Sequence, residues 1–76
     1  MDIAAQAKEA IEQAIPGADV SVTGSGGHFE IRVVSAAFEG QRMVQKQRMV
    51  YRAIKHLMAG DAAPMHAVDR MECLTP

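Results

Sequence analysis

The most constraining feature of the sequence is the stretch 28–34, in which apolar and polar residues alternate. This period of two is typical of a strand that buries one face and exposes the other. A second β-prone stretch, 19–23, lies just before it, and the glycine-rich segment 24–27 separates the two. The sequence therefore predicts an antiparallel hairpin with one apolar face. It places His28 at the start of the second strand, on the solvent-exposed face.

Two helical segments can cover the apolar face of this hairpin. Residues 3–15 carry isoleucine and alanine at three- and four-residue intervals, with Asp2 placed to cap the first turn and Pro16-Gly17 placed to end the helix. Residues 41–58 have the same periodicity, and we expect one broad apolar stripe of this helix to be buried. That stripe consists of Met43, Val44, Val50, Tyr51, Ile54, Leu57 and Met58.

A last β-prone stretch, 65–74, completes the expected set of elements after a break at 60–64. The connection 35–40 leaves room for a short extra helical turn. Because an isolated hairpin is only marginally stable, the three strands are expected to share one sheet with the helices on one of its faces. The predicted fold class is α+β in the order α-β-β-α-β, with residues 1–76 forming a single domain.

Length and composition favour binding over catalysis. A chain of 76 residues with 49% hydrophobic residues can build a core, but it is short for enclosing a deep substrate pocket of roughly 300 Å³ or more. No serine has the context of a nucleophile elbow, and the single cysteine, Cys73, has only a distant histidine as a base. We expect a non-enzyme in a reducing, cytoplasmic compartment, with neither a signal peptide nor a membrane span.

The histidines at positions 28, 56 and 66 are the residues best suited to bind a soft metal or to do acid–base chemistry near neutral pH. No two of them have a local ligand spacing, but one edge of a three-stranded sheet can hold both His28 and His66. Two imidazoles fill only half of a four-coordinate iron or zinc site, so the other ligands would come from another molecule. For each histidine, an ordinary surface role is the alternative.

The helix at 41–58 carries five of the eight basic residues, with no acidic residue between Gln41 and Gly60. Three interpretations stay open: a solvated helix face, a contact with nucleic acid, and a docking surface for an acidic partner. Few aromatic residues are available for base stacking, which weakens the second interpretation. Met49 and Ala53 are expected among the charges. The candidate partner-binding or nucleic-acid-binding residues are Arg42, Lys46, Arg48, Met49, Arg52 and Lys55.

Several motifs together resemble those of the BolA family. They span nearly the whole chain and consist of Ser35-x-x-Phe38-x-Gly40, Val50-Tyr51, His66-Ala67 and the closing Thr75-Pro76. The resemblance implies a fold like the type II KH domain, in which two strands are antiparallel and a third pairs in parallel.

The same resemblance implies a function. BolA-like proteins pair with monothiol glutaredoxins and share a glutathione-ligated [2Fe-2S] cluster, to which they contribute the histidine of the His-Ala segment, here His66. His28 matches the position of a second histidine or cysteine ligand between the first two strands. The implied protein is a non-enzymatic adaptor in iron–sulfur trafficking or in iron or redox regulation. Its cluster is shared with glutaredoxin and glutathione, and the isolated chain is a monomer or weak homodimer without a cluster.

The alternative is a DNA-binding transcriptional regulator that uses the basic helix 41–58, which a KH-like fold would permit. Where the family often has Arg-His-Arg in this helix, the chain has Lys46-Gln47-Arg48, so no role of the middle histidine carries over. The run from His66 to Pro76 is slightly longer than the family pattern, which leaves the register of the last strand open.

Overall fold

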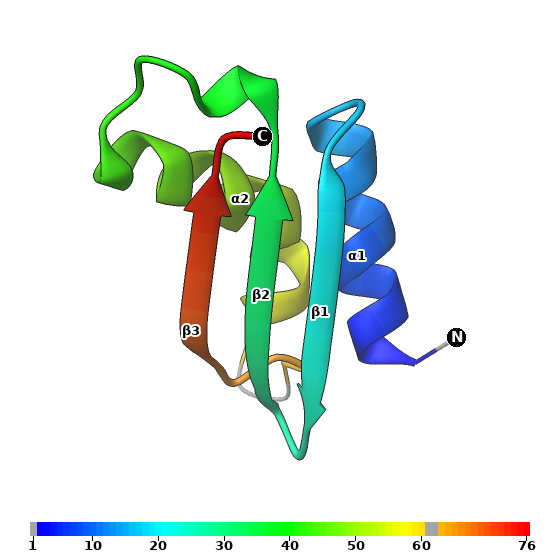
Figure 1. Cartoon of the computed structure of the whole chain (residues 1–76). Helices are drawn as coiled ribbons and strands as arrows, with labels where there is room; N and C mark the ends of the chain where they lie inside the picture. Colours follow the sequence, from blue (N-terminus) through cyan, green and yellow to red (C-terminus); the bar gives the residue numbers. More distant parts are fainter. Residues whose placement is uncertain (1, 61–62) are drawn as a thin grey trace.

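The computed structural model describes residues 2–60 and 63–76, so Met1 and part of the predicted break, Asp61 and Ala62, lie outside the described residues. A three-stranded sheet has the order β1-β2-β3, and both helices lie on one of its faces (Figure 1). This confirms the predicted α+β class and element order. The elements are α1 (Ile3–Ala14), β1 (Asp19–Ser25), β2 (His28–Val34), the 3-10 turn η1 (Ala36–Phe38), α2 (Met43–Met58) and β3 (Ala67–Leu74).

The turn between β1 and β2 is tighter than the sequence predicts. β1 continues through Ser25, which pairs with His28, so only Gly26 and Gly27 remain in the turn. Both glycines have a positive φ, 62° and 84°, which is typical of the two-residue turns whose twist matches that of a hairpin. His28 is therefore the first residue of β2 to pair with β1.

β3 pairs in parallel with β2, as the family resemblance implied. The register shifts once: Phe29 pairs with Val68, but Glu30 pairs with Arg70. Asp69 is thus an extra residue with no Cα partner on β2, which is the definition of a β-bulge. The bulge settles the register that the sequence had left open, and it lies one residue pair away from His28.

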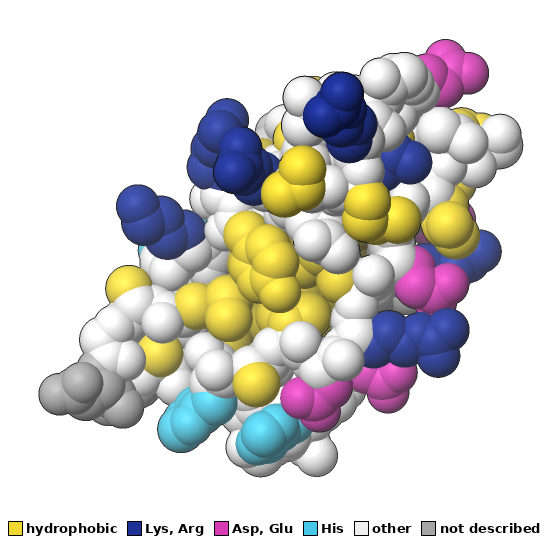
Figure 2. All heavy atoms as spheres, turned by 90° about the vertical axis from the view of Figure 1, so that its left-hand side faces the viewer, with side chains coloured by type: hydrophobic (Ala, Val, Ile, Leu, Met, Phe, Trp, Pro, Cys, Tyr) yellow, Lys and Arg dark blue, Asp and Glu magenta, His cyan; other side chains and the backbone are white. Residues whose placement is uncertain are grey.

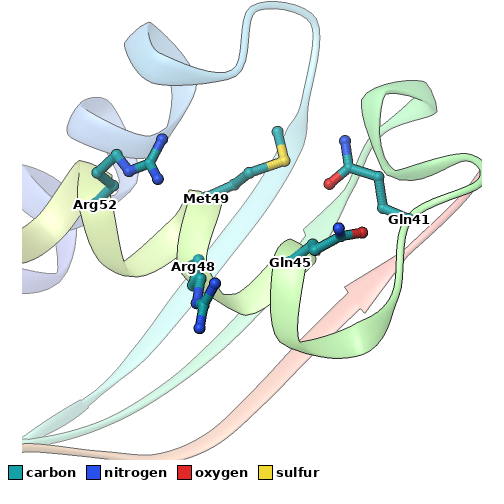
Figure 3. Close-up of a pocket in the computed structure, with 5 residues that line it drawn as sticks. All are labelled: Gln41, Gln45, Arg48, Met49 and Arg52. Carbon is teal, nitrogen blue, oxygen red and sulfur yellow. The ribbon is translucent and has the colours of Figure 1, made fainter.

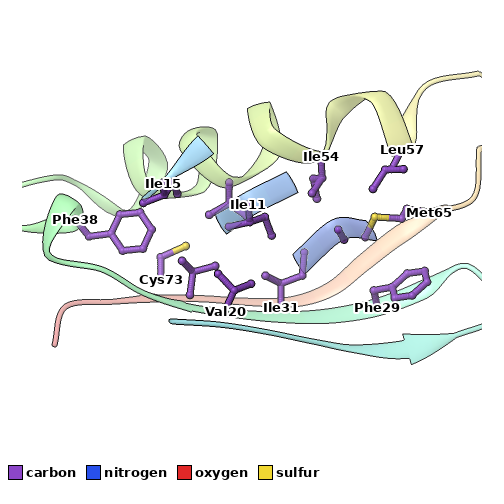
Figure 4. Close-up of a cluster of buried hydrophobic side chains, with 13 residues drawn as sticks. Ile11, Ile15, Val20, Phe29, Ile31, Phe38, Ile54, Leu57, Met65 and Cys73 are labelled. Carbon is purple, nitrogen blue, oxygen red and sulfur yellow. The ribbon is translucent and has the colours of Figure 1, made fainter. Parts of the chain in front are cut away.

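The core lies between the sheet and the two helices (Figure 4). The alternation in β2 sets its floor, because Phe29, Ile31 and Val33 are each at most 4% exposed while their neighbours face solvent. At the N-terminus of α1, the Asp2 carboxylate accepts a hydrogen bond of 2.7 Å from the Ala5 N–H, as predicted. The buried cluster consists of Ala7, Ile11, Ile15, Val20, Phe29, Ile31, Val33, Phe38, Val50, Ile54, Leu57, Met65 and Cys73.

The segment that follows β2 closes one end of the core. The Ser35 N–H donates to the Leu74 carbonyl at 2.9 Å, and the Ser35 hydroxyl oxygen accepts from the Ala37 N–H at 3.1 Å. This cap starts η1, the short helical turn for which the sequence left room, and η1 directs the fully buried Phe38 into the core. The Ser-x-x-Phe part of the family motif therefore has a structural role.

α2 exposes three residues that the sequence analysis placed in its buried stripe. Met43, Val44 and Tyr51 are 55%, 50% and 40% exposed, so that part of the prediction is wrong. The first turn of α2, with Met43 and Val44, reaches beyond the β3 edge of the sheet (Figure 1), whereas Tyr51 lies further along the helix on a side that faces solvent. The rest of the stripe is buried as predicted: Val50, Ile54 and Leu57 belong to the core, and Met58 packs against it.

α2 buries instead part of the side that was expected to be polar. Met49 and Ala53 are half-buried and pack against the core. They line a hollow together with Ala14 and Ile15 from the end of α1. Because α2 packs against α1 as well as against the sheet, its buried surface also includes the side that faces α1.

None of the helices in the described part of the chain is long and apolar enough to cross a bilayer.

The packing of α2 predicts a contrast between two substitutions on the same helix. Ile54→Ala should lower the free energy of unfolding by about 2–5 kcal/mol, because it removes a fully buried side chain and leaves a cavity. Val44→Ala removes a half-exposed side chain and should change it by less than about 0.5 kcal/mol. Urea denaturation followed by circular dichroism measures both, and equal losses would contradict this orientation of α2.

Candidate functional site

Two of the three histidines meet at one end of the sheet. His28 begins β2 and pairs with Ala67, the residue that follows His66. The backbone N–H groups of His66 and Ala67 both donate to the Gly27 carbonyl, at 2.8 and 3.0 Å. Both residues are exposed, and Figure 2 shows histidine side chains at the end of the molecule where the β1–β2 turn lies. The fold therefore brings together the two residues that the sequence analysis singled out as metal ligands.

The turn glycine Gly27 gives the His66 ring its place. A Cβ at Gly27 would lie 2.7 Å from Cδ2 and 2.9 Å from Cγ of His66, well inside van der Waals contact. The imidazole thus packs over the turn at a position where only glycine leaves room for it. Gly27 therefore positions His66 in two ways. Its carbonyl accepts the backbone N–H of His66, and its lack of a side chain leaves room for the His66 ring.

His28 has a carboxylate partner that the sequence analysis did not identify. Its Nδ1 lies 3.2 Å from Oδ1 of Asp69, and the two side chains are 62% and 56% exposed. A carboxylate can only accept, so the Nδ1–H donates. Asp69 is the bulged residue of β3, and the only sequence signal for it was the extra length of the run after His66.

This end of the sheet supplies two nitrogen donors and no thiolate. Within residues 2–60 and 63–76, no group of three or more histidine, cysteine or acidic side chains is arranged to hold a metal ion. Cys73 is only 2% exposed, and burial raises the pKa of its thiol, which the nearby charge of Lys46 offsets only in part. A metal or cluster bound at His28 and His66 therefore needs further ligands from another molecule.

The remaining histidine, His56, is exposed in the last turn of α2. A cationic side chain at this end of a helix is favoured by the partial negative charge of the free carbonyl groups. The position of His56 at the end of α2 is therefore enough to explain it as an ordinary surface histidine.

The six candidate residues of the basic helix do not form one surface. Arg48, Met49 and Arg52 line a shallow hollow of about 430 Å³ together with Gln41 and Gln45. In Figure 3 the side chain of Met49 extends toward Gln41 across this hollow. Met49 is half-buried, so it contributes a wall of the hollow and not a protruding apolar contact.

The other flank of α2 combines cations with exposed apolar side chains. Arg48, Arg52 and Lys55 line a second hollow of about 260 Å³ with Tyr51 and Met58. Figure 2 shows a patch of hydrophobic side chains in the middle of this face, with Lys and Arg side chains above it and histidines below it. An apolar patch with charged and polar groups around it is typical of a protein interface.

The other two candidates lie apart from these hollows. Arg42 is the N-terminal flanking residue of α2, where its N–H donates to the Gln45 side chain at 3.0 Å. Lys46 is half-buried, and its charge lies near Cys73.

Known proteins are similar to this chain in sequence. A family model described as BolA-like protein matches residues 4–76. An uncharacterized protein from the rpoN-murA intergenic region of Acinetobacter guillouiae is 38% identical over 63 residues, which cover 83% of this chain and 74% of that protein. BolA-like protein 1 of Mus musculus is 42% identical over 45 residues, which cover 59% of this chain but only 31% of that protein.

A solved structure extends the similarity to the whole fold. The crystal structure of a bol-like protein from Babesia bovis superimposes with a TM-score of 0.75 at 29% sequence identity. The superposition covers 100% of this chain and 87% of the other. The arrangement of two helices on one face of a three-stranded mixed sheet is therefore shared with that protein.

The contact between Gly27 and His66 predicts a difference between the two turn glycines. Gly26→Ala and Gly27→Ala should each lower the free energy of unfolding by about 1–2 kcal/mol, because both positions have a positive φ. Only Gly27→Ala should also shift the His66 ring resonances in an NMR spectrum, since a Cβ at Gly26 would meet nothing within 4 Å. Equal shifts of the His66 ring in both variants would contradict the contact.

Proposed function

This chain belongs to the BolA-like protein family, and we propose that it acts as a non-enzymatic adaptor that pairs with a monothiol glutaredoxin and shares a glutathione-ligated [2Fe-2S] cluster with it. The cellular role would be iron–sulfur trafficking or iron and redox regulation in the cytoplasm. The observation that carries the proposal is that two exposed histidines, His28 and His66, lie at the same end of the sheet. The chain's single cysteine, Cys73, is buried in the core and is not part of this site.

The donor set fits a shared cluster better than a cluster held by this chain alone. His28 and His66 each offer one nitrogen, and the two missing ligands would be thiolates from the glutaredoxin cysteine and from glutathione. When bound, such a cluster supplies an iron–sulfur unit that can be passed on or sensed. This chain's own residues hold the two imidazoles at the surface, where a partner can reach them.

The positive flank of α2 supports an interaction with a partner protein. Arg48, Arg52 and Lys55 would attract an acidic surface and orient it during encounter, while Tyr51 offers apolar contact area. In Figure 2 this patch and the histidines lie on the same side of the molecule. One partner could therefore cover both.

The proposal predicts that the spectrum of the shared cluster depends on His66. Anaerobic reconstitution of this protein with a monothiol glutaredoxin, glutathione, iron and sulfide should give visible absorption and circular dichroism different from those of glutaredoxin alone. His66→Ala should restore the spectrum of glutaredoxin alone, because the mixed nitrogen and sulfur ligation is lost. His56→Ala is the matched control and should keep the new spectrum, since this histidine lies in the last turn of α2. A spectrum that is identical with and without His66 would contradict the proposal.

A DNA-binding regulator is the second candidate, favoured by the exposed cations Arg48 and Arg52 beside two glutamine side chains. It predicts that Arg48→Glu combined with Arg52→Glu weakens DNA binding and flattens the dependence of log K on log salt by about two, if each arginine contacts one phosphate. His66→Ala should leave this binding unchanged. Fluorescence anisotropy with a labelled duplex at several salt concentrations makes the measurement, and binding that ignores both charge reversals would exclude the candidate.

A further inference from the structure

We infer that Asp69 is a positioning residue for His28: its carboxylate holds the His28 imidazole in the Nδ1–H tautomer and thereby assigns Nε2 as the ligand atom. This inference rests on the proposed function and names a device within the same site. It concerns a residue that neither the motifs nor the helical periodicity singled out, and it follows from the strand register together with one side-chain contact.

The tautomer follows from the chemistry of the contact. The Asp69 carboxylate has no proton to give, so the 3.2 Å contact with Nδ1 requires a proton on that nitrogen. A neutral imidazole carries one N–H, and the lone pair is then on Nε2. A free histidine in water favours the opposite form, with the proton on Nε2. The carboxylate therefore reverses the intrinsic preference of the ring.

The β-bulge is what places Asp69 beside His28. Cys73 is buried and Met71 packs against the core, so strict alternation along β3 would direct residue 69 toward the core as well. Instead Val68 packs against the core, and the side chain of Asp69 is 56% exposed. The extra residue at the register shift thus turns the carboxylate out of the apolar layer and toward the start of β2.

A carboxylate behind a metal-binding imidazole is a recurrent arrangement. Histidine ligands usually donate their second N–H to a carboxylate or carbonyl, which fixes the tautomer, orients the ring and raises its basicity. In the part of the chain that the structure describes, His28 has such a partner in Asp69, whereas His66 is placed by packing over Gly27. The two nitrogen donors are therefore positioned by different means, and only His28 depends on a second side chain.

The first test uses the full chain without any metal. With ¹⁵N-labelled histidine at about pH 8, where most imidazoles are neutral, long-range ¹H–¹⁵N correlation spectra report the tautomer of each ring. His28 should be in the Nδ1–H form in the original protein and shift to the Nε2–H form in Asp69→Ala. Asp69→Glu keeps a carboxylate, which can only accept, and should retain the Nδ1–H form. Glu72→Ala, which removes a carboxylate from the same strand, should change nothing at His28.

The second test uses the complex reconstituted with a monothiol glutaredoxin, glutathione, iron and sulfide. Asp69→Ala should speed the loss of the cluster to an iron chelator by roughly tenfold or more, in line with the effect of removing such partners from other metal sites. Asp69→Glu, which keeps a carboxylate, should recover most of this loss, and Glu72→Ala should behave like the original protein. Visible circular dichroism follows the decay in each case.

The outcomes separate this inference from the proposed function. An Nε2–H form of His28 in the original protein, or an unchanged tautomer in Asp69→Ala, overturns the inference even if the shared cluster forms. Equal decay rates for Asp69→Ala and Glu72→Ala overturn the positioning role in the complex. If the original protein forms no mixed cluster, the proposed function fails and with it the ligand role of Nε2, while the NMR result still decides whether Asp69 sets the tautomer.

Discussion

The Gly27 carbonyl accepts the backbone N–H groups of both His66 and Ala67, and the rest of the structure depends on this junction. It joins the β1–β2 turn to the start of β3, two parts of the chain that are far apart in sequence. From this point β3 runs alongside β2 in the same direction, which gives the mixed sheet. The junction also decides where the His66 ring lies, because the absent side chain of Gly27 leaves room for it. One contact between a turn and a strand therefore contributes both to the fold and to the candidate site.

The molecule divides stability and binding between different parts. Both helices and the apolar face of the sheet enclose the core, so the large favourable term from apolar burial lies on that side (Figure 4). The histidines, Asp69 and three cations of α2, Arg48, Arg52 and Lys55, are exposed, and changes among them remove little buried area. Such a division suits an adaptor, since its binding residues can vary without loss of the fold. Tyr51 and Val44 share this property, because the part of α2 that carries them extends past the sheet or faces away from it.

Local rules predict what depends on neighbours in sequence, and they fail where the outcome depends on packing partners. The alternation in β2, the Asp2 cap and the order of the elements are all local, and the structure has them. The buried arc of α2 was predicted wrongly at Tyr51 and Met49, since periodicity gives a stripe but not the position of α1 beside it. For the candidate site, the hairpin entrance and the family motif led to His28 and His66 as proposed ligands, and the structure brings both to one end of the sheet. Asp69 could not be found in this way, because its place depends on a register shift that exists only once β3 has paired.

The incomplete ligand set has a thermodynamic consequence within the proposed function. A chain that offers only His28 and His66 binds a cluster weakly until a partner brings the missing thiolates, so cluster binding and partner binding are linked. By reciprocity, the cluster must raise the affinity of the two proteins by the same factor as the partner raises the affinity of this chain for the cluster. Because both imidazoles are exposed in the free chain, their desolvation is postponed until the partner covers them. The complex would then be stable with the cluster and short-lived without it, which is the behaviour that a carrier needs to release its partner after delivery.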